Sequence, residues 1–226
     1  MKTSKKYQQI KEKIDPQKDY TFEEAIDFIQ QNKNRKFDES VELHFKLGIN
    51  LKKTEQTVKG VVVLPYADFI KNKIVAFVEP EKEKEAKEAG ADIIGGKDLI
   101  EVIKKDGKIN FDTVVATPVM MKELVVLAKI LGPKGLMPSP KNGTITNNIS
   151  DAIKQLKTGK TSFKNDDGGN IHQIIGKISS DKNKILKNAK TLLEAVKKGK
   201  PSKFKGVYIK KITLCSSMGP SLKIKV

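Results

Sequence analysis

The chain has 226 residues, of which 38% are hydrophobic, enough to bury the core of one large domain or two ordinary ones. Its 44 basic and 27 acidic side chains give a formal net charge of +17, which favours a polyanionic partner and above all nucleic acid. Cys215 is the only cysteine, so the sequence excludes a disulfide framework and a cysteine-based zinc site.

No run of residues approaches the roughly 18 consecutive apolar side chains of a membrane span. The charged start, residues 1–13, lacks the apolar core of a signal peptide. We therefore expect an intracellular, cytoplasmic protein. In such a reducing compartment, Cys215 is interpreted as a small apolar residue of a strand and not as a nucleophile.

The first 66 residues predict one helix and two strands. Thr21 followed by Glu24 has the spacing of a capping box, and the apolar residues after it predict a helix over 22–31. Over 40–49, apolar and polar residues alternate, which is typical of a strand with one buried face. A shorter apolar run predicts a second strand over 60–64.

The middle of the chain repeats a short apolar strand followed by a helix three times. This alternation predicts a parallel sheet covered by helices, as in a Rossmann-like α/β domain. A further helix is predicted over 149–156. The repeated strands cover 74–78, 92–94 and 113–116, and the helices between them cover 81–89, 97–105 and 119–130.

The last part of the chain predicts a hairpin, a long helix and two more strands. A turn at 166–169 forms the hairpin. The helix covers 181–198, with Ser179 or Ser180 as its cap and Gly199 at its end. The four strands cover 160–164 and 170–175, which form the hairpin, and then 207–214 and 222–226.

Neither terminal segment offers a complete sheet by itself, since the first supplies only two strands. We therefore expect residues 1–66 and 157–226 to form one discontinuous domain, with 67–156 inserted as a separate α/β domain. The terminal segments carry 13 basic and 10 acidic residues, and 17 and 4, whereas the insert carries 14 and 13. The net charges are thus +16 and +1, which assigns the binding of a polyanion to the discontinuous domain.

An enzymatic alternative depends on two weak patterns. Residues 159–161, Gly-Lys-Thr, resemble the end of a phosphate-binding P-loop, but Lys154 stands where that motif needs a glycine. His44 and His172 lie in no recognisable catalytic pattern, so both are interpreted as hydrogen-bonded strand residues. An enzyme with a cofactor pocket in the insert therefore ranks below a nucleic-acid-binding protein, and we expect no cofactor and no metal.

Residues 131–144 read LGPKGLMPSPKNGT, a string dense in Gly, Pro and Lys. The simpler interpretation is a long surface loop after a helix. The Gly-x-x-Gly turn from Gly132 to Gly135 would also let the backbone approach phosphates closely, with Lys134 and Lys141 adding positive charge.

Five motifs along the chain carry a resemblance to one family. They are similar in order and content to motifs of the bacterial-type large-subunit ribosomal proteins of the L-one family. The resemblance implies a discontinuous split α+β RNA-binding domain with an inserted three-layer Rossmann-like domain. The motifs are KFDESVEL at 36–43, FDTVVATPVMM at 111–121, LGPKGLMPSPKNGT at 131–144, HQIIGKIS at 172–179 and SSMGP at 216–220.

The resemblance also implies a function without catalysis. Members bind the ribosomal RNA of the mobile stalk of the large subunit and assist release of deacylated tRNA from the exit site. Many bacterial members repress translation by binding their own mRNA. We therefore expect a cytoplasmic ribosome as the location, with an organellar ribosome as the alternative. A non-ribosomal RNA-binding regulator is the alternative function, and co-sedimentation with large subunits separates the two.

The RNA contacts that the resemblance implies fall on both ends of the chain. Gly219 would let the backbone approach the ribose-phosphate chain, Met218 would supply a pliable apolar contact, and Ser217 would bond a 2′-hydroxyl. Glu42 would accept hydrogen bonds from 2′-hydroxyl or base amino groups. The predicted RNA-binding set is Lys36, Phe37, Glu42, Lys164, His172, Ser216, Ser217, Met218, Gly219 and Pro220.

Two further sets concern the insert. Its loop is predicted to face tRNA, and the two chain crossings between the domains are predicted to act as a hinge. The loop residues are Gly132, Lys134, Gly135 and Lys141, and the hinge residues are Pro65, Tyr66 and Gly159.

The chain departs from the family pattern at four places. Ser217 replaces the usual Thr and keeps the hydroxyl, whereas Lys134 replaces the usual Arg and loses bidentate geometry toward phosphate. Residues 66–69 read Tyr-Ala-Asp-Phe where a His-Gly-Thr-Gly-like connector is expected. Asp167 stands where a basic residue is expected, which weakens the case for a phosphate contact at this turn.

Overall fold

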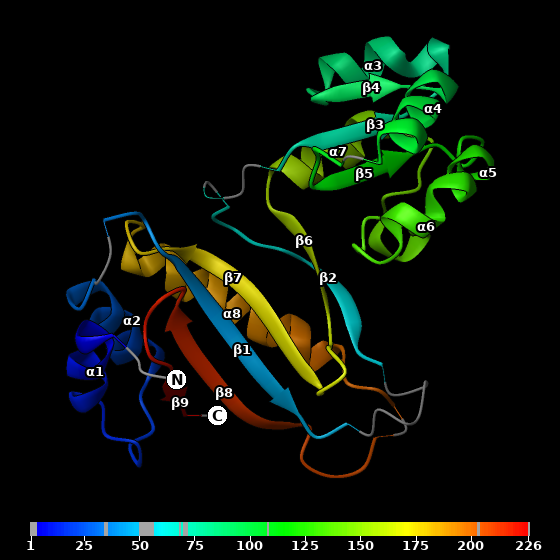
Figure 1. Cartoon of the computed structure of the whole chain (residues 1–226). Coiled ribbons are helices and arrows are strands. Elements are labelled where there is room, and N and C mark those ends of the chain that lie inside the picture. Colours follow the sequence, from blue (N-terminus) through cyan, green and yellow to red (C-terminus); the bar gives the residue numbers. More distant parts are fainter. Residues whose placement is uncertain are drawn as a thin grey trace. The chain divides into compact units, whose positions relative to one another are not determined.

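The computed structural model describes residues 4–33, 36–49, 57–67, 69, 72–107, 109–202 and 204–225, without the side chains of Asp106 and Lys141. The chain divides into two compact units (Figure 1). Unit 1 combines Met1–Phe69 with Thr161–Val226, and unit 2 is Ile70–Lys160. The two ends of the chain therefore belong to the same unit. Among the described residues, no helix is long and apolar enough to cross a bilayer.

Unit 1 is built on a four-stranded antiparallel sheet in the order β7-β1-β8-β9. β1, Ser40–Leu47, is the predicted alternating strand, and its apolar positions are buried while its polar positions are not. The strand therefore has one face in the core and one face outside it. The other strands come from the last part of the chain: β7, Asn170–Lys177; β8, Ile209–Ser216; and β9, Leu222–Ile224.

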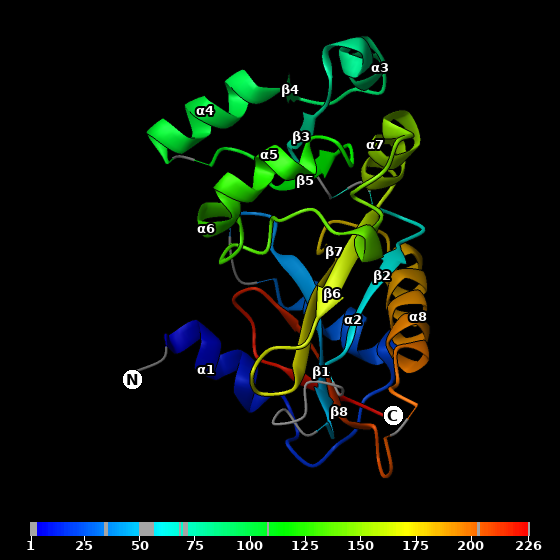
Figure 2. The same cartoon turned by 90° about the vertical axis from the view of Figure 1, so that its right-hand side faces the viewer.

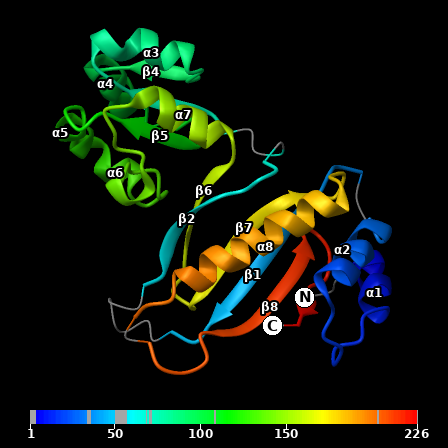
Figure 3. The same ribbon diagram turned by 180° about the vertical axis from the view of Figure 1, so that it is seen from behind.

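Two helices complete the core of unit 1. α8, Lys182–Lys198, packs along one face of the sheet against β7, and α2, Phe22–Gln31, packs beside it against β8 and β9 (Figure 3). The predicted apolar stripe of α8 is present, because Ile185, Leu192 and Val196 are fully buried. A helix stripe against an apolar sheet face is the usual way in which such elements bury their surface.

The N-terminal cap predicted for α2 is present, whereas α8 has a different cap from the one predicted. α2 begins at the predicted capping box: the Thr21 hydroxyl accepts from the Glu24 N–H at 3.2 Å, and the Glu24 carboxylate accepts from the Thr21 N–H at 2.9 Å. The predicted cap of α8 is wrong, because Asp181 caps it in place of Ser179 or Ser180. Asp181 directly precedes the first helical residue, so its side chain reaches the free N–H groups of the first turn.

One helix of unit 1 is not predicted from the sequence. α1, Lys5–Glu12, has Ser4 as its cap and contains no buried residue. Apolar periodicity is the main sequence signal of a helix, and a helix without a buried face does not produce it.

β2, Lys59–Val63, and β6, Lys160–Lys164, pair with each other as a separate two-stranded sheet (Figures 1 and 2). The predicted hairpin is therefore wrong, because β6 pairs with β2 while β7 pairs with β1. The turn itself forms, since the Asp166 carboxylate accepts from the N–H groups of Gly168 and Asn170 at 2.9 and 2.6 Å. A turn reverses the chain but does not decide which strands pair across it.

Unit 2 is the predicted three-layer α/β structure, with a parallel sheet in the order β4-β3-β5. β3 is buried on both faces: Val75 and Phe77 join the apolar cluster under α4, α5 and α6, whereas Ile74 and Ala76 join the cluster under α3 and α7 (Figure 2). The strands are β3, Ile74–Phe77; β4, Ile93–Gly95; and β5, Thr113–Ala116. The helices are α3, Glu83–Glu88; α4, Lys97–Asp106; α5, Met121–Leu124; α6, Ala128–Leu131; and α7, Ile149–Lys157.

The predicted helix over 119–130 is interrupted. α5 and α6 are joined by the 3-10 turn Val125–Leu127. Its first two residues are exposed valines, and β-branched side chains lose rotamer freedom in an α-helix. Further 3-10 turns occur at Pro80–Lys82, before α3, and at Pro140–Asn142.

We expect Asp181→Ala to lower the free energy of unfolding by about 1 kcal/mol, because the first turn of α8 loses its cap. Asp181→Asn keeps an oxygen acceptor, so its free energy of unfolding should fall by only a few tenths of a kcal/mol. Urea denaturation followed by circular dichroism measures both. An equal loss in the two variants would mean that the charge of Asp181, and not its capping hydrogen bond, stabilises the helix.

Candidate nucleic-acid interface

The face of the four-stranded sheet opposite α8 carries mostly polar side chains. Because side chains alternate along a strand, the polar positions of β1 share this face with those of its neighbours. His44, for example, lies between His172 on β7 and Thr213 on β8. We call this surface the open face; its residues are all at least partly exposed and comprise Glu42, His44, Lys46, Asn170, His172, Ile174, Lys211, Thr213, Cys215 and Lys223.

A groove of about 440 Å³ lies on the open face. Lys46 and Lys211 are directly opposite each other in the pairing of β1 with β8, and both border the groove. Two cations beside neutral hydrogen-bonding groups suit a ribose-phosphate chain, which offers anionic oxygens and 2′-hydroxyls. The groove is lined by His44, Phe45, Lys46, Asn170, His172, Lys211, Thr213 and Ser221.

The loop after β8 lies beside the start of β1. The Ser217 N–H donates to the Ser40 carbonyl at 3.0 Å, and the Ser40 N–H donates to the Ser217 hydroxyl oxygen at 3.2 Å. The Ser217 hydroxyl also lies 3.4 Å from the Glu42 carboxylate. The structure thus brings together predicted residues from the two ends of the chain.

The next two residues of the loop differ in how they are held. Met218 is 45% exposed, which is unusual for a large apolar side chain. The Gly219 N–H donates to the Ser216 carbonyl at 3.1 Å, and a Cβ at Gly219 would collide with the Ser216 hydroxyl. A larger residue here would therefore require the Ser216 hydroxyl to move. Ser216 and Pro220, at the two ends of the loop, are buried.

A buried carboxyl group that the sequence does not single out anchors this loop. Glu39 is fully buried, and its Oε2 accepts from the Met218 N–H at 3.2 Å. Its Oε1 has no hydrogen-bond partner among the described residues. An acidic residue before a strand gives no pattern that distinguishes it from a solvated one, so sequence reasoning could not have found this role.

The segment before β1 is tied to the chain after β7. The Asp38 carboxylate accepts from the Ser179 hydroxyl at 2.6 Å and from its N–H at 3.1 Å, and these hydrogen bonds lower the pKa of Asp38. Lys36 and Phe37 precede this attachment, and Phe37 is 53% exposed. Phe37 therefore does not belong to the core of unit 1.

The open face also carries a connected polar cluster. His44 Nδ1 lies 2.7 Å from His172 Nδ1, and His44 Nε2 lies 3.0 Å from the Cys215 thiol. Burial and the neighbouring His172 lower the pKa of His44, so its imidazole is neutral at pH 7. Burial and the charge of Glu42 raise the pKa of Cys215 to about 11. Cys215 lies in a strand, as expected, but on the polar face of the sheet, where its thiol contacts an imidazole.

The remaining predicted residues lie elsewhere. Lys164 is exposed at the end of β6, in the two-stranded sheet and not on the open face. The loop with Gly132 and Lys134 belongs to unit 2, where the Gly135 N–H donates to the Gly132 carbonyl at 3.0 Å and Gly135 has φ +70°. The Gly-x-x-Gly segment is thus a tight turn. The side chain of Lys141 lies outside the described part of the chain.

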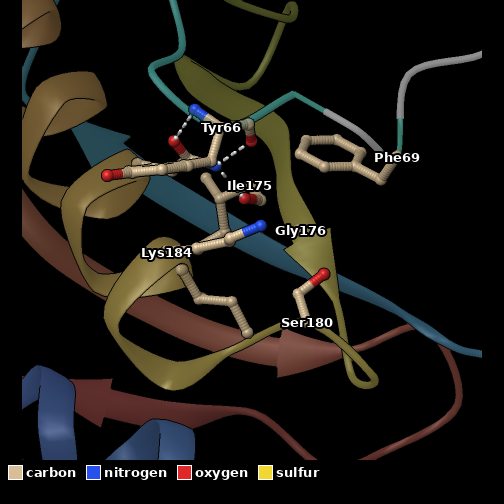
Figure 4. Close-up of a pocket in the computed structure, with 8 residues that line it drawn as sticks. Tyr66, Phe69, Ile175, Gly176, Ser180 and Lys184 are labelled. Carbon is tan, nitrogen blue, oxygen red and sulfur yellow. Dashed lines mark hydrogen bonds between the residues drawn. The ribbon is translucent and has the colours of Figure 1, made fainter.

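The predicted hinge residues are held differently at the two crossings. The Tyr66 N–H donates to Asn188 Oδ1 at 3.1 Å, and Asn188 Nδ2 donates to the Tyr66 carbonyl at 2.6 Å (Figure 4). Lys184 and Lys187 of α8 lie over the Tyr66 ring, 5.6 and 5.4 Å from its centre. Tyr66 is therefore fixed to α8. At the other crossing, Gly159 has φ +109°, a conformation that favours glycine.

The comparisons with known proteins agree over nearly the whole chain. The model of the ribosomal protein L1p/L10e family matches residues 29–220. A large ribosomal subunit protein uL1 from Thermosipho melanesiensis is 42% identical over 223 residues, which cover 99% of this chain and 96% of the relative. A protein of the same name from Persephonella marina is 44% identical, over 100% of this chain and 94% of the relative. Another from Pseudoalteromonas atlantica is also 44% identical, over 99% of this chain and 95% of the relative.

The turn before β7 should respond to acid. Hydrogen bonds from Asn170, and then from His172 and Gly168, lower the pKa of Asp166 from 3.8 to about 2. A lowered pKa stabilises the fold above the unfolded-state pKa, and this contribution is lost as the pH falls through about 2. We therefore expect the wild-type chain to lose more unfolding free energy than Asp166→Asn between about pH 4 and pH 2. Denaturant titrations at each pH measure this, and parallel curves would contradict it.

Proposed function

We propose that this chain, which belongs to the ribosomal protein L1p/L10e family and is a protein of the large ribosomal subunit, holds the ribosomal RNA of the stalk on unit 1. The proposed contact surface is the open face together with the loop Ser216–Pro220. The family is one of structural ribosomal proteins and not of enzymes.

The observation that carries this proposal is the meeting of the two chain ends. Glu42 and Ser217 lie at hydrogen-bond distance, and exposed Met218 follows in the same loop. Their chemistry suits single-stranded or irregular RNA, because a hydroxyl and a carboxylate bond 2′-hydroxyls while a thioether packs on a base. Glu39 holds the loop through its hydrogen bond with the Met218 N–H, and Asp38 holds the segment before β1 through its hydrogen bond with the Ser179 hydroxyl.

Charge supports the same assignment. The net charge of residues 1–66 and 157–226 together is +16, against +1 for residues 67–156. Lysines contact phosphates without reading sequence, so they supply affinity, and the groups of the loop supply the specific contacts. Binding should therefore weaken steeply as salt rises, with a log-log slope of about −0.7 for each neutralised phosphate.

Met218→Asp should weaken binding of stalk RNA at least about tenfold, or about 1.4 kcal/mol, because it places a carboxylate against RNA. Met218→Leu keeps an apolar side chain of similar size and serves as the matched control. Filter binding at fixed salt measures both, and thermal melting shows that both variants fold. Equal affinity of a folded Met218→Asp variant would remove the loop from the RNA surface.

We further propose that unit 2 assists release of deacylated tRNA from the exit site. The turn Gly132–Gly135 presents backbone and the exposed Lys134 to a phosphate chain. Because Tyr66 is fixed to α8, bending at the first crossing would begin after it, while Gly159 would absorb the change at the second. Pro65 and Tyr66 then act as the fixed end of the hinge.

Lys134→Glu should slow the release of deacylated tRNA from ribosomes reconstituted with the variant, while binding of stalk RNA stays unchanged. The reason is that a carboxylate replaces an ammonium group opposite the tRNA backbone. Lys104→Glu, the same charge change on α4, is the control. Equal release rates for the two variants would leave the turn without a role in tRNA release.

We also propose that the same RNA surface represses translation of the chain's own mRNA. One surface binding two RNAs of similar shape would make both activities depend on the same residues. Met218→Asp should then relieve repression of a reporter that carries the leader of this mRNA, and Lys134→Glu should not. Repression that survives Met218→Asp would separate the two activities.

A further inference from the structure

Three side chains of different chemistry converge on the open face, from two neighbouring strands. Glu42 and His44 are on β1, and Cys215 lies opposite Glu42 on β8. The two strands lie side by side in the sheet (Figure 1). Their ligand atoms all lie within 4.8 Å of one another, with His44 Nε2 at 3.0 Å from Cys215 Sγ and 3.8 Å from Glu42 Oε2. All three side chains are half-buried, so they are partly shielded from water yet reachable from it.

A chain of hydrogen bonds orients the imidazole of His44 toward this cluster. The Asp166 carboxylate can only accept, so His172 Nε2, 3.4 Å away, donates to it. When His172 is neutral, its Nδ1 is the acceptor, and His44 Nδ1 donates to it at 2.7 Å. This leaves the lone pair of His44 Nε2 directed at Cys215 and Glu42. Histidine ligands of metals are commonly held in this way by a partner on the other ring nitrogen.

We propose that Glu42, His44 and Cys215 form a binding site for a thiophilic divalent cation of the zinc type. Carboxylate oxygen, imidazole nitrogen and thiolate sulfur are the three ligand types that Zn²⁺ takes in proteins. Tetrahedral coordination would set the ligand atoms about 3.5 Å apart, within reach of small rotamer changes from the distances above. A water molecule would complete the coordination on the exposed side.

Binding replaces one proton by the cation. The Cys215 thiol, whose sulfur lies 3.0 Å from His44 Nε2, gives its proton to solvent, and the thiolate and the imidazole lone pair then bind the metal. No sequence motif identifies these three residues as a site, because they come from strands at opposite ends of the chain. A single cysteine excludes sites of several cysteines but not this mixed site, which shares Glu42 with the proposed RNA surface but needs no RNA to bind the cation.

Co²⁺ added to the full-length chain is the probe, because cobalt bound to a thiolate gives a charge-transfer band in the near ultraviolet. We expect the wild-type chain to give this band at one equivalent of Co²⁺, and Zn²⁺ to abolish it by displacement. Cys215→Ser should remove the band, and His44→Gln should weaken Co²⁺ binding at least about tenfold. Thr213→Ser, on the same face and strand, should behave as the wild type.

Three results would overturn the site. They are a wild-type chain without the band, a band that survives Cys215→Ser, and a His44→Gln variant that binds Co²⁺ as the wild type does. Circular dichroism of each variant shows that the sheet is intact. Cys215→Ser changes one atom of a half-buried side chain, so its fold should survive even if that of His44→Gln does not. Stalk-RNA binding by the metal-free chain is a separate measurement, so failure of one proposal does not decide the other.

Discussion

The pairing of β1 with β7 along one side and with β8 along the other is the interaction on which unit 1 depends. The three strands come from opposite ends of the chain, so neither end has a sheet without it. Val41, Leu43 and Phe45 of β1 are at most 1% exposed. Complete burial of such a side chain contributes about 1.5 to 3 kcal/mol, which opposes the entropy lost in closing the sheet. That entropy grows only slowly with the length of the intervening chain, so a folded insert is tolerated there.

The same pairing decides what the open face contains. A slip of one residue would exchange the two faces of β1, exposing Phe45 and burying His44 and Lys46. Burying a lysine ammonium without a partner costs far more than the apolar contacts could return. The register that protects the core is thus also the register that sets His44 against His172. Core stability and the chemistry of the surface are not separable in this sheet.

Local patterns predicted the elements whose structure depends on their own residues. The alternation of β1 and the capping box at Thr21 formed as expected, because each encodes its own burial or its own hydrogen bonds. The strand–helix repeat of unit 2 also formed, with an interruption in the predicted helix over 119–130. The choice of strand partners was different. β6 has a turn directly after it and still pairs with β2, whereas β7, its predicted hairpin partner, pairs with β1 at the edge of the four-stranded sheet.

Residues of the candidate site could be named from the sequence only where they belong to a recognisable motif. Met218 and Glu42 could be named from resemblance, but Glu39 and Cys215 could not, because their roles exist only once distant segments meet. Glu39 is fully buried beneath the loop, and its Oε2 accepts a hydrogen bond from the Met218 N–H. Its other carboxyl oxygen, Oε1, has no hydrogen-bond partner among the described residues. Removing a carboxyl group from water costs free energy, which offsets what its hydrogen bond to the Met218 N–H contributes. The contact therefore fixes the position of the loop more than it stabilises the fold.

Glu42 stands where the loop and the histidine cluster meet. Its carboxylate lies 3.4 Å from the Ser217 hydroxyl on one side and 3.8 Å from His44 Nε2 on the other. One carboxylate cannot serve both neighbours fully. A ligand that draws it toward His44 and Cys215 withdraws it from Ser217, and RNA that engages it at the loop does the reverse. Because coupling between two binding equilibria is reciprocal, each ligand would change the affinity for the other by the same factor. The Glu42 carboxylate, unfavourable by charge on the proposed RNA surface, would then connect the proposed RNA contact with the proposed metal site.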